Sequence, residues 1–121
     1  MQNKKDLKDR TKEFALRIMK MYSSLPKSVQ AQVLGKQVLR SGTSVGANYH
    51  EAFRGRSKAE FLAKMGDCLK ELDETTYWFE LLVKGGIITE NKLAGLLQES
   101  KELTAIFVTI IKKTKSNHDK K

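Results

Sequence analysis

Residues 57–86, SKAEFLAKMGDCLKELDETTYWFELLVKGG, decide the fold class of this chain. Ser57 and Glu60 have the Ser-x-x-Glu spacing of a capping box, in which a hydroxyl and a carboxylate satisfy free amides at a helix start. Apolar residues then recur at steps of three and four, which places them on one helical face. That expected core face comprises Phe61, Met65, Cys68, Leu72, Thr76, Phe79 and Val83. Gly85 supplies the left-handed residue that commonly ends a helix, so a helix over residues 57–84 is predicted.

The same helical periodicity extends to both sides of this segment. It predicts helices over residues 4–25 and 28–54, separated by Pro26, and over residues 89–115, beginning at the capping hydroxyl of Thr89. Their expected inward-facing residues are Leu7, Thr11, Phe14, Ile18, Met21, Tyr22, Leu25, Leu34, Val38, Val45, Ala52, Leu93, Leu97, Thr104, Phe107 and Ile111. Residues from about Ser116 onward should fray.

Four amphipathic helices with short connections pack most simply as an all-α, up-down-up-down four-helix bundle. The 121 residues fit a single domain over residues 1–121, because one domain typically contains roughly 100–200 residues. Gly35, Gly42 and Gly46 each cost the second helix about 1 kcal/mol relative to Ala. We expect close packing against a neighbouring helix to offset that cost.

The third and fourth helices are more apolar than one bundle core requires. Trp78 and Leu81 point away from the core face of the third helix, and Leu103, Ile106 and Ile110 form a second strip on the fourth. Exposed apolar surface of this kind marks a partner interface, and Trp is enriched at such interfaces. We expect Trp78, Leu81, Ile106 and Ile110 to form an oligomer interface; in the alternative, loops or a tilted neighbouring helix cover them.

The composition excludes several classes of protein. Cys68 is the single cysteine, so neither an internal disulfide nor a cysteine-rich zinc site can form. No apolar segment follows the positive charges after Met1, and no window approaches the roughly 18 apolar residues of a membrane span. We therefore expect a cytoplasmic protein that makes no use of a membrane.

No pattern in the chain predicts catalysis, and we expect a non-enzymatic protein without catalytic, cofactor-binding or metal-binding residues. His50 and His118 lack the Glu-x-x-His spacing of iron-carboxylate bundles. A carboxylate metal enzyme remains a weaker alternative, because four acidic residues cluster on the third helix: Asp67, Glu71, Asp73 and Glu74. In the structural alternative they pair with Lys64 and Lys70 or hydrogen-bond to polar side chains of the second helix.

The net charge of +9 is distributed unevenly. Residues 1–25 contain seven basic and three acidic side chains, and residues 26–56 contain five and one. Residues 57–84 contain four and six, and residues 85–121 contain seven and four. A basic face can neutralise phosphates and release counterions, which gives salt-sensitive binding without sequence preference. The alternative is an ordinary solvated face, and neither interleaved aromatic residues nor a helix-turn-helix pattern decides between them.

Residues 41–61, SGTSVGANYHEAFRGRSKAEF, carry a resemblance to a known family. They resemble the signature of the four-helix-bundle proteins encoded in intervening sequences of 23S ribosomal RNA genes, with Ala52 where many relatives carry Gly. Residues 68–82, CLKELDETTYWFELL, look like the third helix of that family. The matching positions of the signature are Ser41, Ser44, Val45, Asn48, Glu51, Arg54, Ser57, Glu60 and Phe61.

The resemblance implies a bundle that assembles into a ring-like homopentamer. The family that the chain resembles is also related to the accessory variability determinant of diversity-generating retroelements. That basic protein binds nucleic acid and is a partner of a reverse transcriptase. The shared motif looks structural, since Ser44, Asn48 and Glu51 lie within one helical strip and can form a polar seam that ties the second helix to the third.

Charge and resemblance together favour an oligomeric protein that binds RNA or DNA, as an accessory to a larger nucleoprotein machine such as a reverse transcriptase. The side chains expected to contact phosphate are Lys8, Lys12, Lys20, Arg40, Arg54 and Arg56. The rival hypothesis is a protein–protein interaction scaffold with no nucleic-acid role, in which the charge serves only solubility.

Overall fold

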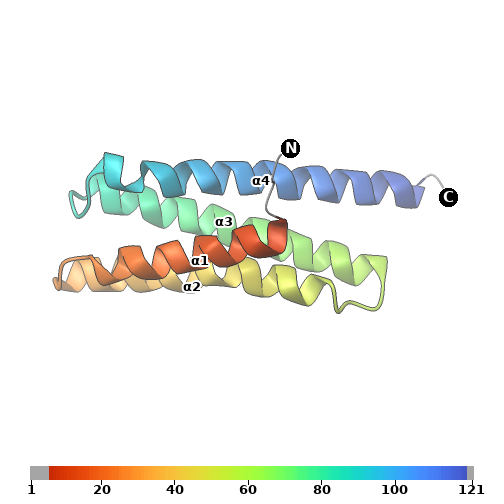
Figure 1. The fold of residues 1–121 in the computed structure, drawn as a ribbon, viewed down its shortest axis with the longest axis horizontal. Helices are drawn as coiled ribbons and strands as arrows, with labels where there is room; N and C mark the ends of the chain where they lie inside the picture. Colours follow the sequence, from red (N-terminus) through yellow and green to blue (C-terminus); the bar gives the residue numbers. More distant parts are fainter. Residues whose placement is uncertain (1–5, 120–121) are drawn as a thin grey trace.

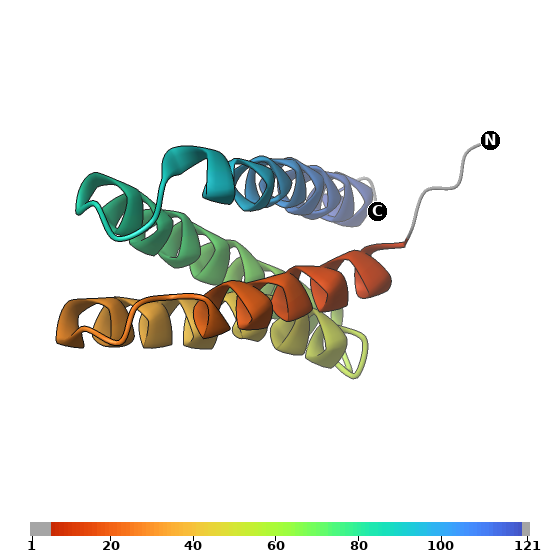
Figure 2. The same ribbon diagram turned by 60° about the vertical axis from the view of Figure 1, so that its left-hand side comes forward.

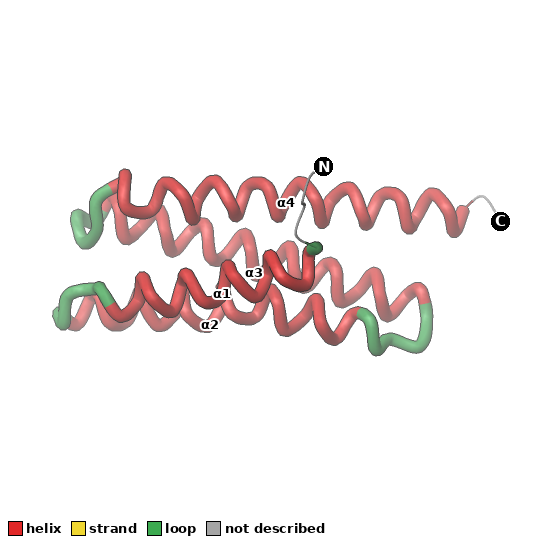
Figure 3. The backbone as a smooth tube through the Cα atoms, viewed as in Figure 1, coloured by secondary structure: helices red, strands yellow, loops and turns green. Residues whose placement is uncertain are grey.

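The computed structural model describes residues 6–119, and this part of the chain contains four α-helices and no strand (Figure 1). The helices are α1 (Leu7–Ser23), α2 (Val29–Ala52), α3 (Lys58–Lys84) and α4 (Glu90–Asp119). Three short loops connect them, and the α1–α2 and α3–α4 loops lie at the end of the molecule opposite the α2–α3 loop (Figure 3). The predicted all-α class and the number of helices are confirmed.

Side-chain caps fix where the first three helices begin. The carboxylate of Asp6 accepts a 2.8 Å hydrogen bond from the amide of Asp9, and the Ser28 hydroxyl caps α2 in the same way. The Ser57 hydroxyl accepts a 3.1 Å bond from the amide of Glu60, as the capping pattern predicts. The carboxylate of Glu60 accepts a 2.6 Å bond from the amide of Arg56. These contacts satisfy amides that have no partner inside a helix.

Several predicted helix ends differ from the structure. α1 ends at Ser23 rather than at residue 25, and α2 ends at Ala52 rather than at residue 54. Gly85 has φ −79° and is right-handed, whereas the left-handed residue after α3 is Gly86, with φ 74°. The chain therefore turns one residue later than expected. Fraying from Ser116 is also wrong, because α4 continues to Asp119. Lysines near that end favour a longer helix, since cations stabilise the negative end of the helix dipole.

The buried core is contributed by all four helices. Its largest side chains with less than 2% exposure are Phe14, Ile18, Val38, Val45, Met65, Leu72, Phe79, Leu82, Leu93, Leu103 and Phe107. This confirms the predicted core faces of α1, α2 and α3 in their main residues. On α4, Leu96, Ser100 and Leu103 are buried, whereas Leu97 and Thr104 are only half-buried.

The α4 prediction is confirmed for Leu93 and Phe107 and wrong for Leu97 and Thr104, because two overlapping apolar strips run along that helix. Periodicity shows that each strip shares a face, but packing against α3 decides which strip faces the core. Leu103 therefore belongs to the core and not to a surplus outer strip. Ile106 and Ile110 are half-buried, and Ile110 packs against the core.

Glycines let α2 approach α1 closely. A Cβ at Gly42 would overlap the Cδ1 of Ile18, and one at Gly35 would lie 2.8 Å from the Cδ1 of Tyr22. This confirms that close helix packing explains these glycines. Among the neighbouring pairs of helices, α2 and α3 pack most extensively, whereas α1 and α4 contact each other least and diverge (Figure 2). One side of α1 therefore packs closely against α2, and the other side packs only loosely against α4.

Candidate nucleic-acid interface

A groove with two lysines on its α1 wall lies between α1 and α2. Lys8 and Lys12 line it from α1, and Tyr49 and His50 line it from α2; its volume is about 380 Å³. Lys8 and Lys12 are exposed and form no ion pair with any other residue of the part described. Two predicted phosphate-contacting residues are thus brought together in what we call the α1–α2 groove, and His50 joins them.

A second cationic groove lies between α1 and α4, where the two helices diverge. Arg17 and Lys20 of α1 and Lys92 of α4 line it, with a volume of about 570 Å³. A Cβ at Gly95 would lie 2.9 Å from the Nη2 of Arg17, so glycine leaves room for the guanidinium. Sequence reasoning identified Lys20 but missed Arg17 and Lys92. Only the fold brings Lys92 to α1, although the Arg17–Lys20 spacing was visible in the sequence.

The α2–α3 loop presents Arg54 and Arg56, which are both exposed. Their backbone amides are held by a 2.9 Å bond to the carbonyl of Glu51 and a 2.6 Å bond to the carboxylate of Glu60. Neither guanidinium forms an ion pair with another residue between 6 and 119. The loop therefore fixes the backbone and leaves both cations accessible to an anion.

An aromatic cluster lies beside these arginines. The ring of Tyr49 contacts the rings of Phe53 and Phe107 edge to face, with centroids 4.8 and 5.7 Å apart, and Phe53 also meets Phe61 at 6.2 Å. Phe53 is 64% exposed. Sequence reasoning found no aromatic residues interleaved with the basic ones. The sequence did contain one signal for this cluster, the direct adjacency of Phe53 to Arg54. The neighbouring rings, however, come together only in the folded chain.

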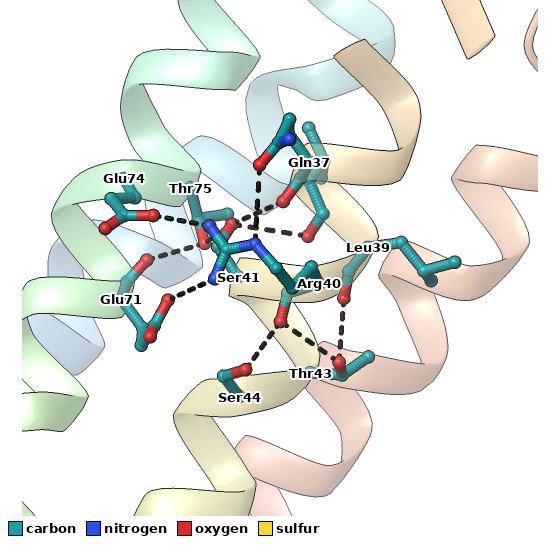
Figure 4. A network of polar contacts seen from close by, with 10 residues as sticks. Gln37, Leu39, Arg40, Ser41, Thr43, Ser44, Glu71, Glu74 and Thr75 are labelled. Atoms are coloured by element: carbon teal, nitrogen blue, oxygen red, sulfur yellow. Dashed lines mark hydrogen bonds and ion pairs between the residues drawn. The ribbon is translucent and has the colours of Figure 1, made fainter. Parts of the chain in front are cut away.

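Arg40 does not resemble the other predicted phosphate-contacting residues. Its guanidinium forms ion pairs of 3.3 Å with Glu71 and 2.5 Å with Glu74 of α3 (Figure 4). The hydrogen bond that the Arg40 guanidinium donates to Glu74, together with the charges of both carboxylates, raises the pKa of Arg40. Two carboxylates therefore compensate the charge of Arg40, which joins α2 to α3 and is a weaker candidate for phosphate contact than the unpaired cations.

The predicted polar seam joins α2 to α3 through fewer residues than expected. Ser44 donates to the carbonyl of Arg40 within its own helix, at 2.7 Å (Figure 4). Within residues 6–119 the side chain of Asn48 has no hydrogen-bond partner. Glu51 does reach α3, because its carboxylate lies 2.6 Å from the ammonium of Lys64. That contact lowers the pKa of Glu51 and raises the pKa of Lys64.

Two of the four residues in the acidic cluster of α3, Glu71 and Glu74, form ion pairs across helices. Glu71 and Glu74 pair with Arg40, and Lys64 pairs with Glu51 rather than with its own helix. The alternative that these carboxylates form ion pairs is thus correct for Glu71 and Glu74, but their partner is Arg40 rather than Lys64 or Lys70. In the described range, no three His, Cys, Asp or Glu side chains are arranged to hold a metal ion.

Cys68 is buried, and its thiol donates to the carbonyl of Val45 at 3.5 Å. Burial, with a smaller contribution from the charge of Asp67, raises the pKa of Cys68 to about 12. At neutral pH the sulfur is a protonated thiol, which is a poor nucleophile. The side chain of His118, the second histidine of the sequence, lies outside the residues whose side chains are described.

The four residues predicted to form an oligomer interface are half-buried: Trp78, Leu81, Ile106 and Ile110. Leu81 lines an apolar groove of about 570 Å³ with Val29, Val33 and Ile87. Val29 is 80% exposed and Val33 is 56% exposed. The buried Nε1 of Trp78 has no hydrogen-bond partner among the described residues. An exposed apolar surface therefore lies around Leu81 and extends onto Val29 and Val33 of α2, an extension that the sequence did not indicate.

None of the helices in the part described is long and apolar enough to span a membrane. A search of curated proteins gives no match. A similar solved structure is a protein of unknown function from the S23 ribosomal protein family of Bacteroides thetaiotaomicron VPI-5482. The two chains are 41% identical with a TM-score of 0.83, and the alignment covers 88% of this chain and 99% of that chain.

Residues 3–109 match the family described as 23S rRNA-intervening sequence protein. This match confirms the resemblance carried by residues 41–61. It extends over all of α1, α2 and α3 and most of α4. The four-helix architecture is shared with the Bacteroides protein. The chain therefore belongs to the 23S rRNA-intervening sequence protein family.

Proposed function

We propose that this chain is a non-enzymatic, oligomeric protein that binds RNA or DNA through α1 and the α2–α3 loop. The observation that carries the proposal is the placement of cations on both sides of α1. Lys8 and Lys12 line one groove, and Arg17 and Lys20 line the other. No carboxylate of the described residues pairs with these four side chains. Free cations along a rigid helix can replace the counterions of a phosphate backbone.

The proposal extends to assembly and setting. The subunit is an up-down-up-down bundle, and five copies form a ring in which each basic surface is repeated. A ring with repeated basic surfaces binds a long polyanion more strongly than one subunit does. Once the first subunit is bound, binding by the next subunit of the same ring is effectively intramolecular. In this proposal the protein is cytoplasmic and acts as an accessory to a nucleoprotein machine such as a reverse transcriptase.

A salt titration tests the proposal. Fluorescence anisotropy measures the affinity for a labelled mixed-sequence duplex between low and physiological salt. We expect log K to fall linearly with log salt, because each phosphate contact releases counterions at a slope of about −0.9 per contact. Absent affinity at low salt, or affinity that does not change with salt, would overturn the proposal.

Matched variants locate the surface. The double variant Lys8→Gln/Lys12→Gln should reduce the salt slope by about 2 per subunit site, because two phosphate contacts are lost. Arg40→Gln is the control, because Glu71 and Glu74 already compensate that charge. The salt slope of Arg40→Gln should equal that of the parent. The melting temperature of each variant shows whether it is still folded. An unchanged slope in the Lys8→Gln/Lys12→Gln variant would remove these two lysines from the proposed site.

The exposed apolar groove supports a second candidate, a protein–protein interaction scaffold. Val29, Val33 and Leu81 leave apolar surface open at one end of the bundle. Leu81→Glu should dissociate the oligomer or release a partner, as measured by sedimentation equilibrium. Leu81 suits this test better than Trp78, which packs against the core. An unchanged mass together with intact nucleic-acid binding would count against the scaffold.

A further inference from the structure

We infer that the polynucleotide is bound as a single strand, with a base stacked on the ring of Phe53. This inference rests on the proposed function, because it assumes that the basic surface binds a polynucleotide. It adds the strand state of the ligand and the residue that contacts a base.

Phe53 is presented to solvent as a supported platform. It is the C-cap residue of α2 and is 64% exposed. Its ring meets Tyr49 edge to face at 86° and Phe61 at 62°, so two neighbours hold it in place. A ring that is already ordered loses little conformational entropy when a base stacks on it. Every base has a π-face, so such stacking requires no particular sequence.

The platform is continuous with the cationic surface. Tyr49 lines the α1–α2 groove beside Lys8 and Lys12, and the same ring packs against Phe53. On the other side of Phe53 the chain continues directly to Arg54 and then Arg56. Cations therefore flank the exposed ring on both sides. A strand that crosses it can place phosphates on these cations and a base on the ring.

A duplex cannot use this arrangement fully. Its bases are stacked on one another and expose only their edges in the grooves, so no base face is free for Phe53. A duplex would contact Lys8, Lys12 and the arginines through phosphates alone. A single strand gains the stacking contact in addition, and an apolar ring between cations serves that ligand better than a continuous row of lysines.

The test compares three probes of one sequence: a labelled RNA strand of about 15 nucleotides, the matching DNA strand and the DNA duplex. Phe53→Ala should weaken binding of a single strand about tenfold, the loss expected for one stacked base, and leave duplex affinity unchanged. Phe53→Trp should retain the parent affinity. The RNA and DNA strands together show whether the sugar matters.

Tyr77→Ala is the matched control, because Tyr77 is 54% exposed and packs edge to face on Trp78 of α3, apart from the Phe53 cluster. It should leave single-strand affinity unchanged. A direct signature comes from Phe53→Trp in a Trp78→Phe background, where stacking should quench the emission of the one remaining indole. Circular dichroism confirms that each variant is folded.

The outcomes separate this inference from the proposed function. Equal affinity for strand and duplex, with no effect of Phe53→Ala, would overturn the stacking inference and leave salt-dependent binding intact. Loss of duplex and single-strand binding alike in Phe53→Ala would also overturn it, because the ring would then support the whole surface. If no probe binds at low salt, the proposed function fails and this inference fails with it.

Discussion

The hydroxyl of Thr75 on α3 donates a 2.8 Å hydrogen bond to the hydroxyl of Ser41 on α2, and both residues are fully buried. The hydroxyl of Ser41 in turn donates a 2.9 Å hydrogen bond to the carbonyl of Gln37 in its own helix (Figure 4). The two hydroxyls thereby satisfy each other where α2 and α3 pack most extensively. Ser41 belongs to the stretch that carries the family signature, and its role here is structural.

Truncating either hydroxyl should cost little, because each has a second partner in its own helix. After Ser41→Ala, Thr75 can still donate to the carbonyl of Glu71, which is 2.7 Å away. After Thr75→Ala, Ser41 still donates to Gln37. We expect each variant to lose about 1 kcal/mol of unfolding free energy in a urea titration. A double-mutant cycle with coupling near zero would show that the bond between them contributes nothing.

Gly42→Ala should destabilise the protein although alanine favours helices. The new Cβ would overlap the Cδ1 of Ile18, which is fully buried and has no free space to enter. Overpacking of this kind costs about 1–3 kcal/mol, more than the gain of about 1 kcal/mol in helix propensity. Thermal unfolding should show a lower melting temperature.

Two further variants make the overpacking test specific. Ile18→Val removes the Cδ1, so Gly42→Ala should cost less in that background than in the parent. Gly66 is an exposed position in α3, where an added Cβ meets nothing within 4 Å. Gly66→Ala should therefore stabilise by about 0.5–1 kcal/mol. A loss at Gly66 similar to that at Gly42 would contradict the explanation.

The buried thiol of Cys68 should make stability fall at alkaline pH. Its pKa is raised to about 12, whereas an unfolded cysteine titrates near 8.5. Above the unfolded value the unfolded chain loses a proton that the folded chain retains, so the free energy of unfolding decreases. Between about pH 8.5 and 12 the loss approaches 1.4 kcal/mol for each pH unit.

Cys68→Ala isolates that contribution from other alkaline groups. The difference in unfolding free energy between parent and variant should narrow as the pH rises from 8 to 10. The folded parent should also react slowly with a thiol reagent at pH 8, and the unfolded chain rapidly. Fast labelling of the folded protein would show that the thiol is accessible.

Arg10 should control how firmly α1 is held to α4. Its guanidinium makes two bonds to Glu99, of 3.0 and 2.7 Å, and one of 2.9 Å to Glu102. These bonds matter because α1 and α4 have the least extensive contact of any neighbouring pair of helices in the bundle. We expect Arg10→Gln to cost about 1–2 kcal/mol, since it leaves the half-buried Glu99 without its partner.

Hydrogen exchange provides the local measurement for Arg10. The amides of the first turns of α1 should exchange faster in Arg10→Gln, whereas those of α2 and α3 should change little. Lys101→Gln is the control, because Lys101 is an exposed cation of α4 that forms no ion pair in the described part of the chain. Uniform exchange changes throughout the bundle would indicate global destabilisation instead.

The sequence by itself determined the four helices, most of their boundaries, the core faces of α1 to α3 and the family. These features depend on local signals, such as the Ser57 cap and the spacing of Phe14, Ile18 and Met21. Helical periodicity identifies which residues share a face because that geometry is fixed within one helix.

Only the tertiary structure decided which neighbour each face meets. It paired Arg40 with Glu71 and Glu74, 31 and 34 positions away, and thereby removed a cation that the sequence had counted as free. It brought Lys92 beside Arg17, gathered Tyr49, Phe53 and Phe61, and selected Leu103 for the core. Pairing and stacking depend on distances between helices, and helical periodicity contains no information about those distances.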